Sequence, residues 1–340
     1  MELNLDLPTD PMERFKEIYE VLWGARTVFS GDSPAALRFA AVTAVTCPGE
    51  PEEVAAGIRD KAEEIKQGVS WFANLRSPLR FIISALLLLH DDEVTEFLAE
   101  VERVGKLFRE KKLRRGAIYE TIAVLLFRIG RDLKPVDEEL VVRFKSVYEA
   151  MKKYHWWLTG PDDFPACALL ALQPESPREI GETVERIYQA LCAQKFRRCN
   201  PLQTAANMLY LARLEPKEAA TRFGLLAAEM RKGGIRVHAY DYDKLAALSF
   251  LNHPPGRIVE KILALHAETK ELRPKPPAHL CLSLATSIAF LELVQRDQDL
   301  EIISDARALV NMQQVIQAQQ ACAAAAASSA AASSAAASSS

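Results

Sequence analysis

The chain has 340 residues, of which 49% are hydrophobic and 26% are charged, and both fractions are ordinary for a folded soluble protein. Its formal net charge of −3 argues against sequence-independent binding to nucleic acid, because such binding needs a basic face that neutralises phosphates. The longest clean apolar stretch, residues 81–89, is far too short to span a bilayer, so we expect no contact with the membrane interior.

The chain repeats a pair of helical patterns, and the second helix of each pair is apolar almost all round. In chain order, these second helices are predicted at residues 39–45, 82–89, 121–127, 166–172, 205–212, 245–251 and 280–291. Aligned on one alanine each, from Ala41 to Ala285, they follow one another at steps of 44, 38, 45, 38, 41 and 38 residues. A mean step of about 41 residues is typical of two-helix repeats, so we predict about seven tandem helical hairpins.

The first helix of each pair carries a single apolar stripe. In residues 93–108, apolar side chains recur at spacings of three and four, with glutamate and arginine between them. Such a helix buries one face, whereas a helix that is apolar all round must be covered on more than one side. We therefore predict two layers. The second helices should bury Leu87, Leu125, Leu170 and Leu209, while Arg103 and Glu185 of the first helices should tolerate alanine.

Boundary residues agree with a helical repeat. Ser176-Pro177-Arg178-Glu179 has the spacing of a capping box at the start of a first helix. No stretch alternates with a period of two, so the predicted fold class is all-α. Because the second helices carry almost no polar stripe, we favour a closed α/α toroid over an open α-solenoid superhelix, whose concave face would be exposed.

The predicted domain organisation is simple. No change in composition divides the repeats, so we predict one helical-hairpin domain over residues 1–296. An amphipathic helix is predicted to follow at residues 297–320. The Ala/Ser-rich tail at residues 321–340 has no apolar face to dock and is predicted to be disordered.

The cysteines and the N-terminus bear on the compartment. The six cysteines fit neither zinc-ligand nor disulfide spacing, and five lie in or beside apolar helical runs. The first ten residues are acidic and lack the pattern of a secretory signal. We therefore expect a cytoplasmic protein, and we expect neither a cofactor nor a bound metal.

Three segments resemble those of one bacterial family. They are LRSPLRFIISALLLL at residues 75–89, HWWLTGPDDFPACALLAL at residues 155–172 and FRRCNPLQTAANMLYLA at residues 196–212. The family is the domain of unknown function numbered four thousand and three, and the resemblance covers about residues 12–320. It implies an all-α fold with a Gln/Ala-rich C-terminal helix. It implies no activity, catalytic residue or cofactor.

A surplus of polar residues lies in the turn before each second helix or in its first turn. Equivalent turns of stacked hairpins lie at the same end of an assembly, so these side chains should form a rim beside several helix N-termini. Arginine, histidine, tyrosine, asparagine and paired aspartates are typical of a polar ligand pocket. The candidate ligand-binding residues are Arg76, Arg80, Arg115, Tyr119, His155, Thr159, Asp162, Asp163, Asn200, Gln203, His238 and Tyr240.

Two other interpretations of the rim remain open. Ser77, Asp162 or Asp163, Asn200 and Asp241 are also good helix N-caps, which is a purely structural role. Alternatively, the protein is a hydrolase or carbohydrate-active enzyme of α/α-toroid type that uses Asp162 and Asp163, an interpretation that rests on fold analogy alone. A general acid/base role would need a second carboxylate or histidine across the rim, such as His238 or Asp241. We favour the binding of a small molecule, a peptide or a protein partner. If the rim is a site, at least one of its arginines should pair with Asp162 or Asp163.

Overall fold

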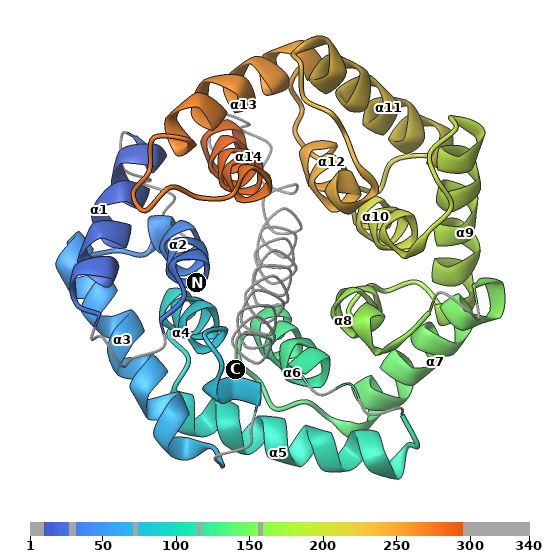
Figure 1. The fold of residues 1–340 in the computed structure, drawn as a ribbon. Helices are drawn as coiled ribbons and strands as arrows, with labels where there is room; N and C mark the ends of the chain where they lie inside the picture. The colour runs from blue at the N-terminus through green and yellow to red at the C-terminus, as the bar shows by residue number, and fades with distance from the viewer. Residues whose placement is uncertain are drawn as a thin grey trace, which may run out of the picture. The chain divides into compact units, whose positions relative to one another are not determined.

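A computed structural model describes residues 10–26, 32–70, 74–113, 116, 118–155 and 159–294 (Figure 1). The predicted helix at residues 297–320 and the tail at residues 321–340 lie outside these described residues. The described residues form fourteen α-helices and no strand, which confirms the all-α class.

The α-helices, in chain order, are α1 (Pro11–Gly24), α2 (Pro34–Thr43), α3 (Pro51–Gly68), α4 (Arg80–Leu89), α5 (Val94–Glu110), α6 (Ile118–Gly130), α7 (Glu138–Tyr154), α8 (Phe164–Ala171), α9 (Pro177–Ala193), α10 (Asn200–Leu211), α11 (Pro216–Lys232), α12 (Tyr242–Leu248), α13 (Pro255–Thr269) and α14 (Ala278–Val294). Short 3-10 turns are η1 (Ala44–Thr46), η2 (Asn74–Arg76), η3 (Pro161–Asp163) and η4 (Ala239–Asp241).

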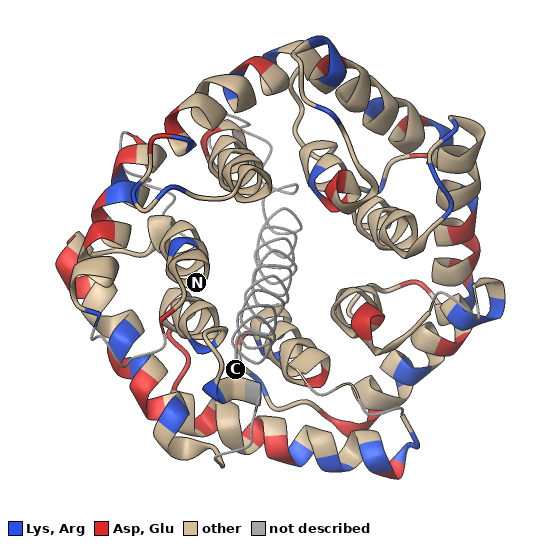
Figure 2. Ribbon diagram, viewed as in Figure 1, with Lys and Arg blue, Asp and Glu red and all other residues tan. Residues whose placement is uncertain are grey.

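The helices alternate between an amphipathic and an apolar type, in the pairs that the sequence pattern predicts. Figure 2 shows that acidic and basic residues concentrate on the odd-numbered helices, such as α5 and α9, and are sparse on the even-numbered ones. The capping box predicted before α9 is present, since Ser176 and Glu179 each bond the other's backbone N–H. The four leucines chosen from the second helices, Leu87, Leu125, Leu170 and Leu209, are all buried, as predicted.

The described residues pack as two compact units. The first contains the residues up to Val94 together with His266–Ile288. Within it, α1 packs on α2 and α3, while α4 packs on α2 and α3, so that two layers form. The prediction that the chain is one domain, and the choice between a toroid and a solenoid, both stay predictions.

The second unit contains Thr95–Leu265 together with the described residues from Ala289 onward. In this unit α8 lies beside α6 and α10, and α10 lies beside α12, which gives a layer of apolar helices. Helices α7, α9 and α11 pack along these (Figure 1). In the part of the chain that the structure describes, no helix is long and apolar enough to cross a membrane.

Candidate functional site

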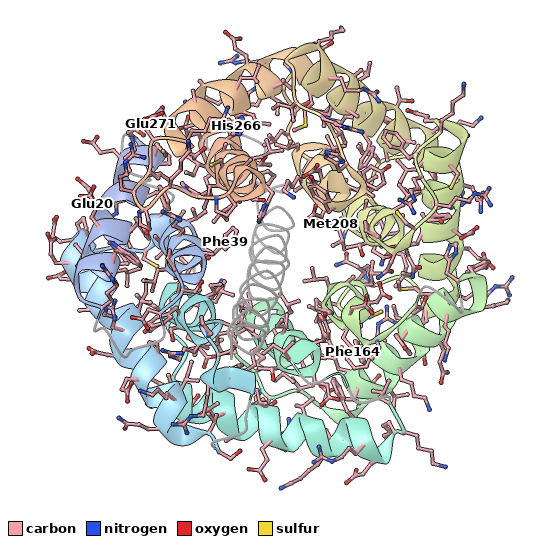
Figure 3. The ribbon with its side chains drawn as sticks, viewed as in Figure 1. Glu20, Phe39, Phe164, Met208, His266 and Glu271 are labelled. Carbon is pink, nitrogen blue, oxygen red and sulfur yellow. The ribbon has the colours of Figure 1, made fainter. Side chains whose placement is uncertain are left out.

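The turn that precedes α8 draws an aspartate into the second unit. Phe164, the first residue of α8, is labelled in Figure 3. It is fully buried and packs edge-on against Phe144 at 5.2 Å and Tyr148 at 5.4 Å between ring centroids. Because Phe164 is buried, the residue before it also lies in the interior, and Asp163 is only 2% exposed. Its Oδ2 accepts a hydrogen bond from the backbone N–H of Gly160 at 3.0 Å, which closes the η3 turn.

The second oxygen of Asp163 is in an unusual state. Asp163 Oδ1 is buried and has no hydrogen-bond partner among the described residues. Burial, together with the neighbouring charge of Asp162, raises the pKa of Asp163 to about 8, although the hydrogen bond from Gly160 opposes the rise. A buried acceptor without a partner costs free energy, so this carboxyl group is poised for a donor.

Asp162 reaches across to the neighbouring helix. It is exposed, and its Oδ2 accepts a hydrogen bond from Asn200 Nδ2 of α10 at 2.5 Å. An added Cβ at Gly160 would lie 2.5 Å from Asp162 Oδ1, so a larger residue there would displace this exposed carboxylate. Asn200 therefore ties two turns together and does not cap its own helix, where the N-cap position belongs to Cys199.

Further polar side chains complete the group. Gln203, 1% exposed, donates from Nε2 to Thr159 Oγ1 at 3.0 Å, and its Oε1 is buried with no partner among the described residues. The pKa of Tyr119 on α6 is raised by burial and then by the charges of Asp162 and Asp163, so the phenol lies near the aspartate pair. We call the six residues Tyr119, Thr159, Asp162, Asp163, Asn200 and Gln203 the Asp163 cluster.

Three other predicted residues of the second unit have different surroundings. His155 is buried, with its Nε2 2.6 Å from Glu185 Oε2 of α9 and its ring 4.3 Å from that of Tyr188. His238 and Tyr240 stack on each other at 4.9 Å in the turn before α12, and Tyr240 is exposed. The imidazole of His155 thus contacts α9, whereas Tyr240 lies in η4 and His238 directly precedes that turn.

The predicted arginines are placed in the first unit or are not described. Arg80 is buried and pairs with Asp32 at 3.3 Å, and Arg76 donates to the carbonyl of Val69 at 3.2 Å. Arg115 lies outside the described residues. Asp32, whose carboxylate also pairs with Arg59 at 3.3 Å, was not expected from the sequence. The predicted pairing of an arginine with Asp162 or Asp163 stays a prediction.

The most informative residue that sequence reasoning missed is Lys244. It stands in the first turn of an apolar helix and is 2% exposed, with Nζ 3.2 Å from Asp241 Oδ1 and 3.6 Å from Asp243 Oδ1. Asp241 closes η4 by accepting from the backbone N–H of His238 at 3.0 Å. The spacing of an aspartate three residues before a lysine, where cation and anion face each other on a helix, was the available signal.

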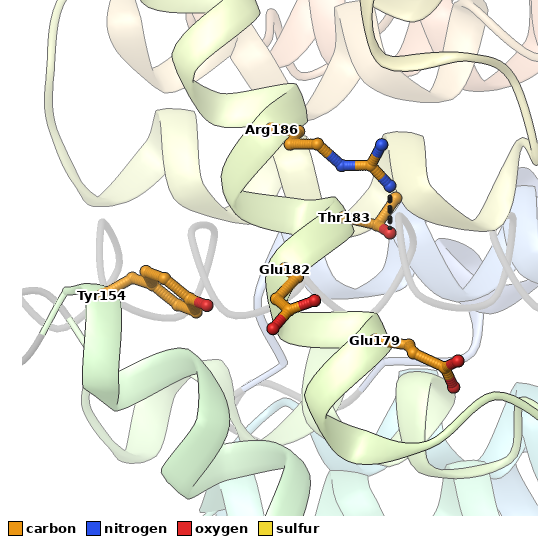
Figure 4. Close-up of a pocket in the computed structure, with 5 residues that line it drawn as sticks. All are labelled: Tyr154, Glu179, Glu182, Thr183 and Arg186. Carbon is orange, nitrogen blue, oxygen red and sulfur yellow. Dashed lines mark hydrogen bonds between the residues drawn. The ribbon is translucent and has the colours of Figure 1, made fainter.

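Two surface hollows lie elsewhere. One, of about 540 Å³, is lined by Tyr154 of α7 and by residues of α9 including Arg186, which donates to Thr183 (Figure 4). The other, of about 650 Å³, lies beside Tyr19 and Trp23 in the first unit. Neither is lined by any of the twelve predicted ligand residues. Among the described residues, no three His, Cys, Asp or Glu side chains are grouped so that they would hold a metal ion.

The fold places the chain among all-α proteins built from pairs of one amphipathic and one apolar helix. The Asp163 cluster lies at the start of two adjacent apolar helices, α8 and α10. The family model described as "Protein of unknown function (DUF4003)" matches residues 40–321, and the chain belongs to this family, which confirms the resemblance. The chain is also similar to "Uncharacterized protein YeaA" of Bacillus subtilis (strain 168). The two are 23% identical over 270 residues, which cover 77% of this chain and 78% of that protein. No solved structure matches the chain.

Proposed function

We propose that this protein binds a small ligand, free or presented by a peptide, through the Asp163 cluster. One observation carries the proposal: Asp163 is a buried carboxyl group with one oxygen that has no partner among the described residues. Proteins seldom bury a polar atom without a partner, because the lost hydration costs about 1–3 kcal/mol. A ligand that supplied the missing hydrogen bond would recover this free energy on binding.

The chemistry of the unpaired atoms indicates the chemistry of the ligand. Besides Asp163 Oδ1, the side-chain oxygens of Asn200 and Gln203 are buried without a partner among the described residues. The amide of Asn200 is oriented by its bond to a carboxylate, which can only accept, so its oxygen is free to accept from elsewhere. Three buried oxygens without a partner, of which Asp163 Oδ1 accepts when its carboxyl group is ionised, favour a ligand rich in hydrogen-bond donors, such as an amine or a polyol.

Hydrolysis by Asp162 and Asp163 is less well supported than binding. A pair of catalytic carboxyl groups must both reach the substrate, one as acid and one as base or nucleophile. Asp163 is buried, and its Oδ2 already accepts a hydrogen bond from the backbone N–H of Gly160. Asp162 is bonded to Asn200. These partners favour a fixed binding site over a pair that exchanges protons with a substrate.

A thermal-shift screen tests the proposal. Native protein would be melted with primary amines (n-butylamine, putrescine, spermidine) and with polyols (sorbitol, trehalose). A ligand at 100 times its Kd adds about 2.7 kcal/mol of stability. We expect at least one of the two classes to raise the Tm of the native protein and to lose that effect in Asn200→Ala.

The matched control for this screen is Gln189→Ala. Gln189 is an exposed residue of α9 in the same unit, and its amide donates to Glu185 at 2.6 Å. Its variant should keep the full ligand-induced shift. If no probe raises the Tm, or if Asn200→Ala and Gln189→Ala respond alike, the Asp163 cluster is not a binding site.

A further inference from the structure

Two turns of the second unit are built on the same plan. Each is a three-residue 3-10 turn, η3 before α8 and η4 before α12. Each ends in an aspartate whose Oδ2 accepts from the backbone N–H three residues earlier, at 3.0 Å in both cases. Asp163 and Asp241 are 2% and 3% exposed, so both carboxyl groups are equally buried.

The residue after each aspartate holds the turn in the same way. Phe164 packs edge-on against Phe144 and Tyr148, and Tyr242 packs edge-on against Phe196 at 5.5 Å. An aromatic anchor therefore follows the closing aspartate in both turns. The two turns are structural equivalents, and a difference between them is informative.

The difference lies three residues after the aspartate. At η4 this residue is Lys244, whose ammonium group lies 3.2 Å from Asp241 Oδ1 and donates to the backbone carbonyl of Tyr240, also at 3.2 Å. At η3 the equivalent residue is Ala166, which has no such group. The equivalent oxygen, Asp163 Oδ1, is buried with no partner among the described residues. The first turn thus has the closing aspartate and the preceding carbonyl of the second turn but lacks its ammonium group. It also has Pro165 where the second turn has Asp243, whose Oδ1 lies 3.6 Å from Lys244 Nζ.

We propose that the ligand of the Asp163 cluster carries a primary ammonium group, which binds at Asp163 Oδ1 and the carbonyl of Asp162 as Lys244 binds at Asp241 and the carbonyl of Tyr240. This inference rests on the proposed function and specifies its ligand class. An ammonium group is a compact charge with three donors and no acceptor, which suits a site of unpaired oxygens.

The surroundings of the first turn suit such a ligand. Gln203 on the adjacent helix, 1% exposed, adds an unpaired oxygen for the remaining donors. Asp162 is exposed and bonded to Asn200, so the cluster extends from solvent to the buried carboxyl group. Asp162 lies beside the buried carboxyl group, and an ammonium group at Asp163 Oδ1 would favour the ionised form of Asp163, so the bound cation would have the negative charge that it requires.

Substituting the residue that differs between the turns tests the proposal. Titration calorimetry would measure n-butylamine binding, with 1-butanol as the uncharged probe of the same chain length. We expect the native protein to bind n-butylamine at least tenfold more tightly than 1-butanol. Ala166→Lys should abolish this binding and raise the Tm, because it supplies the ammonium group from within the chain. Asp163→Asn should weaken the binding at least tenfold.

A reciprocal variant covers the case in which Ala166→Lys does not fold. Lys244→Ala in an Asp163→Asn background removes the internal ammonium group of the second turn and closes the first site to amines. Its Tm should fall, and n-butylamine but not 1-butanol should restore part of the loss. If the native protein does not prefer the amine, the ammonium assignment at the Asp163 cluster is wrong, whichever way this variant behaves.

The outcomes separate this inference from the proposed function. Stabilisation by polyols alone, lost in Asn200→Ala, would leave the Asp163 cluster as a binding site and overturn the ammonium class. The absence of any probe-induced shift would overturn both.

Discussion

At the scale of single residues, the carboxyl group of Asp163 departs from ordinary solution chemistry. An aspartate in an unfolded chain has a pKa near 3.9, whereas burial beside Asp162 raises the pKa of Asp163 to about 8. The carboxyl group therefore stays protonated over a wide pH range only while the protein is folded. This couples the stability of the protein to pH.

The first prediction follows from the sign of this shift. A raised pKa means that the folded state holds the proton more tightly, so the free energy of unfolding falls as pH rises from about 4 through about 8. Asp163→Asn keeps the shape and removes the titration. At pH 8 the variant should be more stable than the native protein by on the order of 2 kcal/mol, and the difference should shrink towards pH 4.

Urea denaturation at pH 4, 6 and 8 measures this difference. Glu110→Gln, at an exposed carboxylate of α5, is the control and should leave the pH profile of the native protein unchanged. A profile for Asp163→Asn that runs parallel to the native one would show that Asp163 titrates normally.

The second prediction concerns a residue that the helical pattern assigned to solvent. Glu185 lies on the amphipathic helix α9, yet its side chain is only 20% exposed and its Oε2 lies 2.6 Å from Nε2 of the buried His155. Glu185→Ala would leave that imidazole without its carboxylate, so the free energy of unfolding should fall by about 1–3 kcal/mol. The expectation that Glu185 tolerates alanine is revised for this reason.

Glu182 is the matched control for Glu185, because it lies one turn earlier on the same helix and pairs with the exposed Arg178. Glu182→Ala should change the free energy of unfolding by no more than about 0.5 kcal/mol. Equal losses from the two variants in urea denaturation would mean that the contact with His155 adds nothing to stability.

At the scale of elements, the turns before α8 and α12 hold buried aspartates because an aromatic residue follows each one. Phe164 is fully buried among Phe108, Phe144 and Tyr148, so it fixes the depth at which the η3 turn enters the unit. The position of the Asp163 cluster thus depends on hydrophobic packing next to it in the chain. Capping uses one oxygen of Asp163 and does not account for the burial of the other.

The third prediction is that removing the side chain of Phe164 lowers the stability of the protein and also exposes Asp163 to water. Phe164→Ala should cost about 3–5 kcal/mol through the cavity it leaves. It should also weaken the pH dependence of stability, because water would reach Asp163. Leu225→Ala, at a side chain that is 50% exposed, should cost no more than about 0.5 kcal/mol. A Phe164→Ala protein that is destabilised but keeps the full pH dependence would separate the anchor from the burial of Asp163.

The helices could be predicted from the sequence more fully than the contacts of the Asp163 cluster. Helix type follows from a period of three to four residues, which is local, so the apolar helices and the capping box at Ser176 were predictable. The contacts of the site join residues about 40 positions apart, such as Asn200 with Asp162 and Gln203 with Thr159. The common turn position of these four residues predicted their grouping, but nothing local predicted that Asp32 would pair with Arg80.

At the scale of the whole molecule, two helices contribute residues to both compact units. The division falls between Leu265 and His266 inside α13, and between Ile288 and Ala289 inside α14. Within the second unit, Lys261 of α13 pairs with Glu292 of α14, and His253 contacts the carbonyl of Leu293 at 3.2 Å. Within the first, Thr269 donates to the carbonyl of Cys281 at 3.1 Å. Loss of either unit would therefore remove packing from part of each shared helix.

The last prediction is that the two units unfold together, as one domain. Leu87→Ala in the first unit and Leu209→Ala in the second each remove a fully buried side chain and should each cost about 2–5 kcal/mol. Because α13 and α14 contribute residues to both units, each variant should lower the Tm of one common transition in differential scanning calorimetry.

The calorimetric and van't Hoff enthalpies of this transition should stay equal in each variant. Val142→Ala, at a side chain that is 45% exposed, is the control and should leave the Tm nearly unchanged. Two transitions, one shifted by Leu87→Ala and the other by Leu209→Ala, would contradict this prediction. They would mean that each unit unfolds independently, so that the chain is two domains.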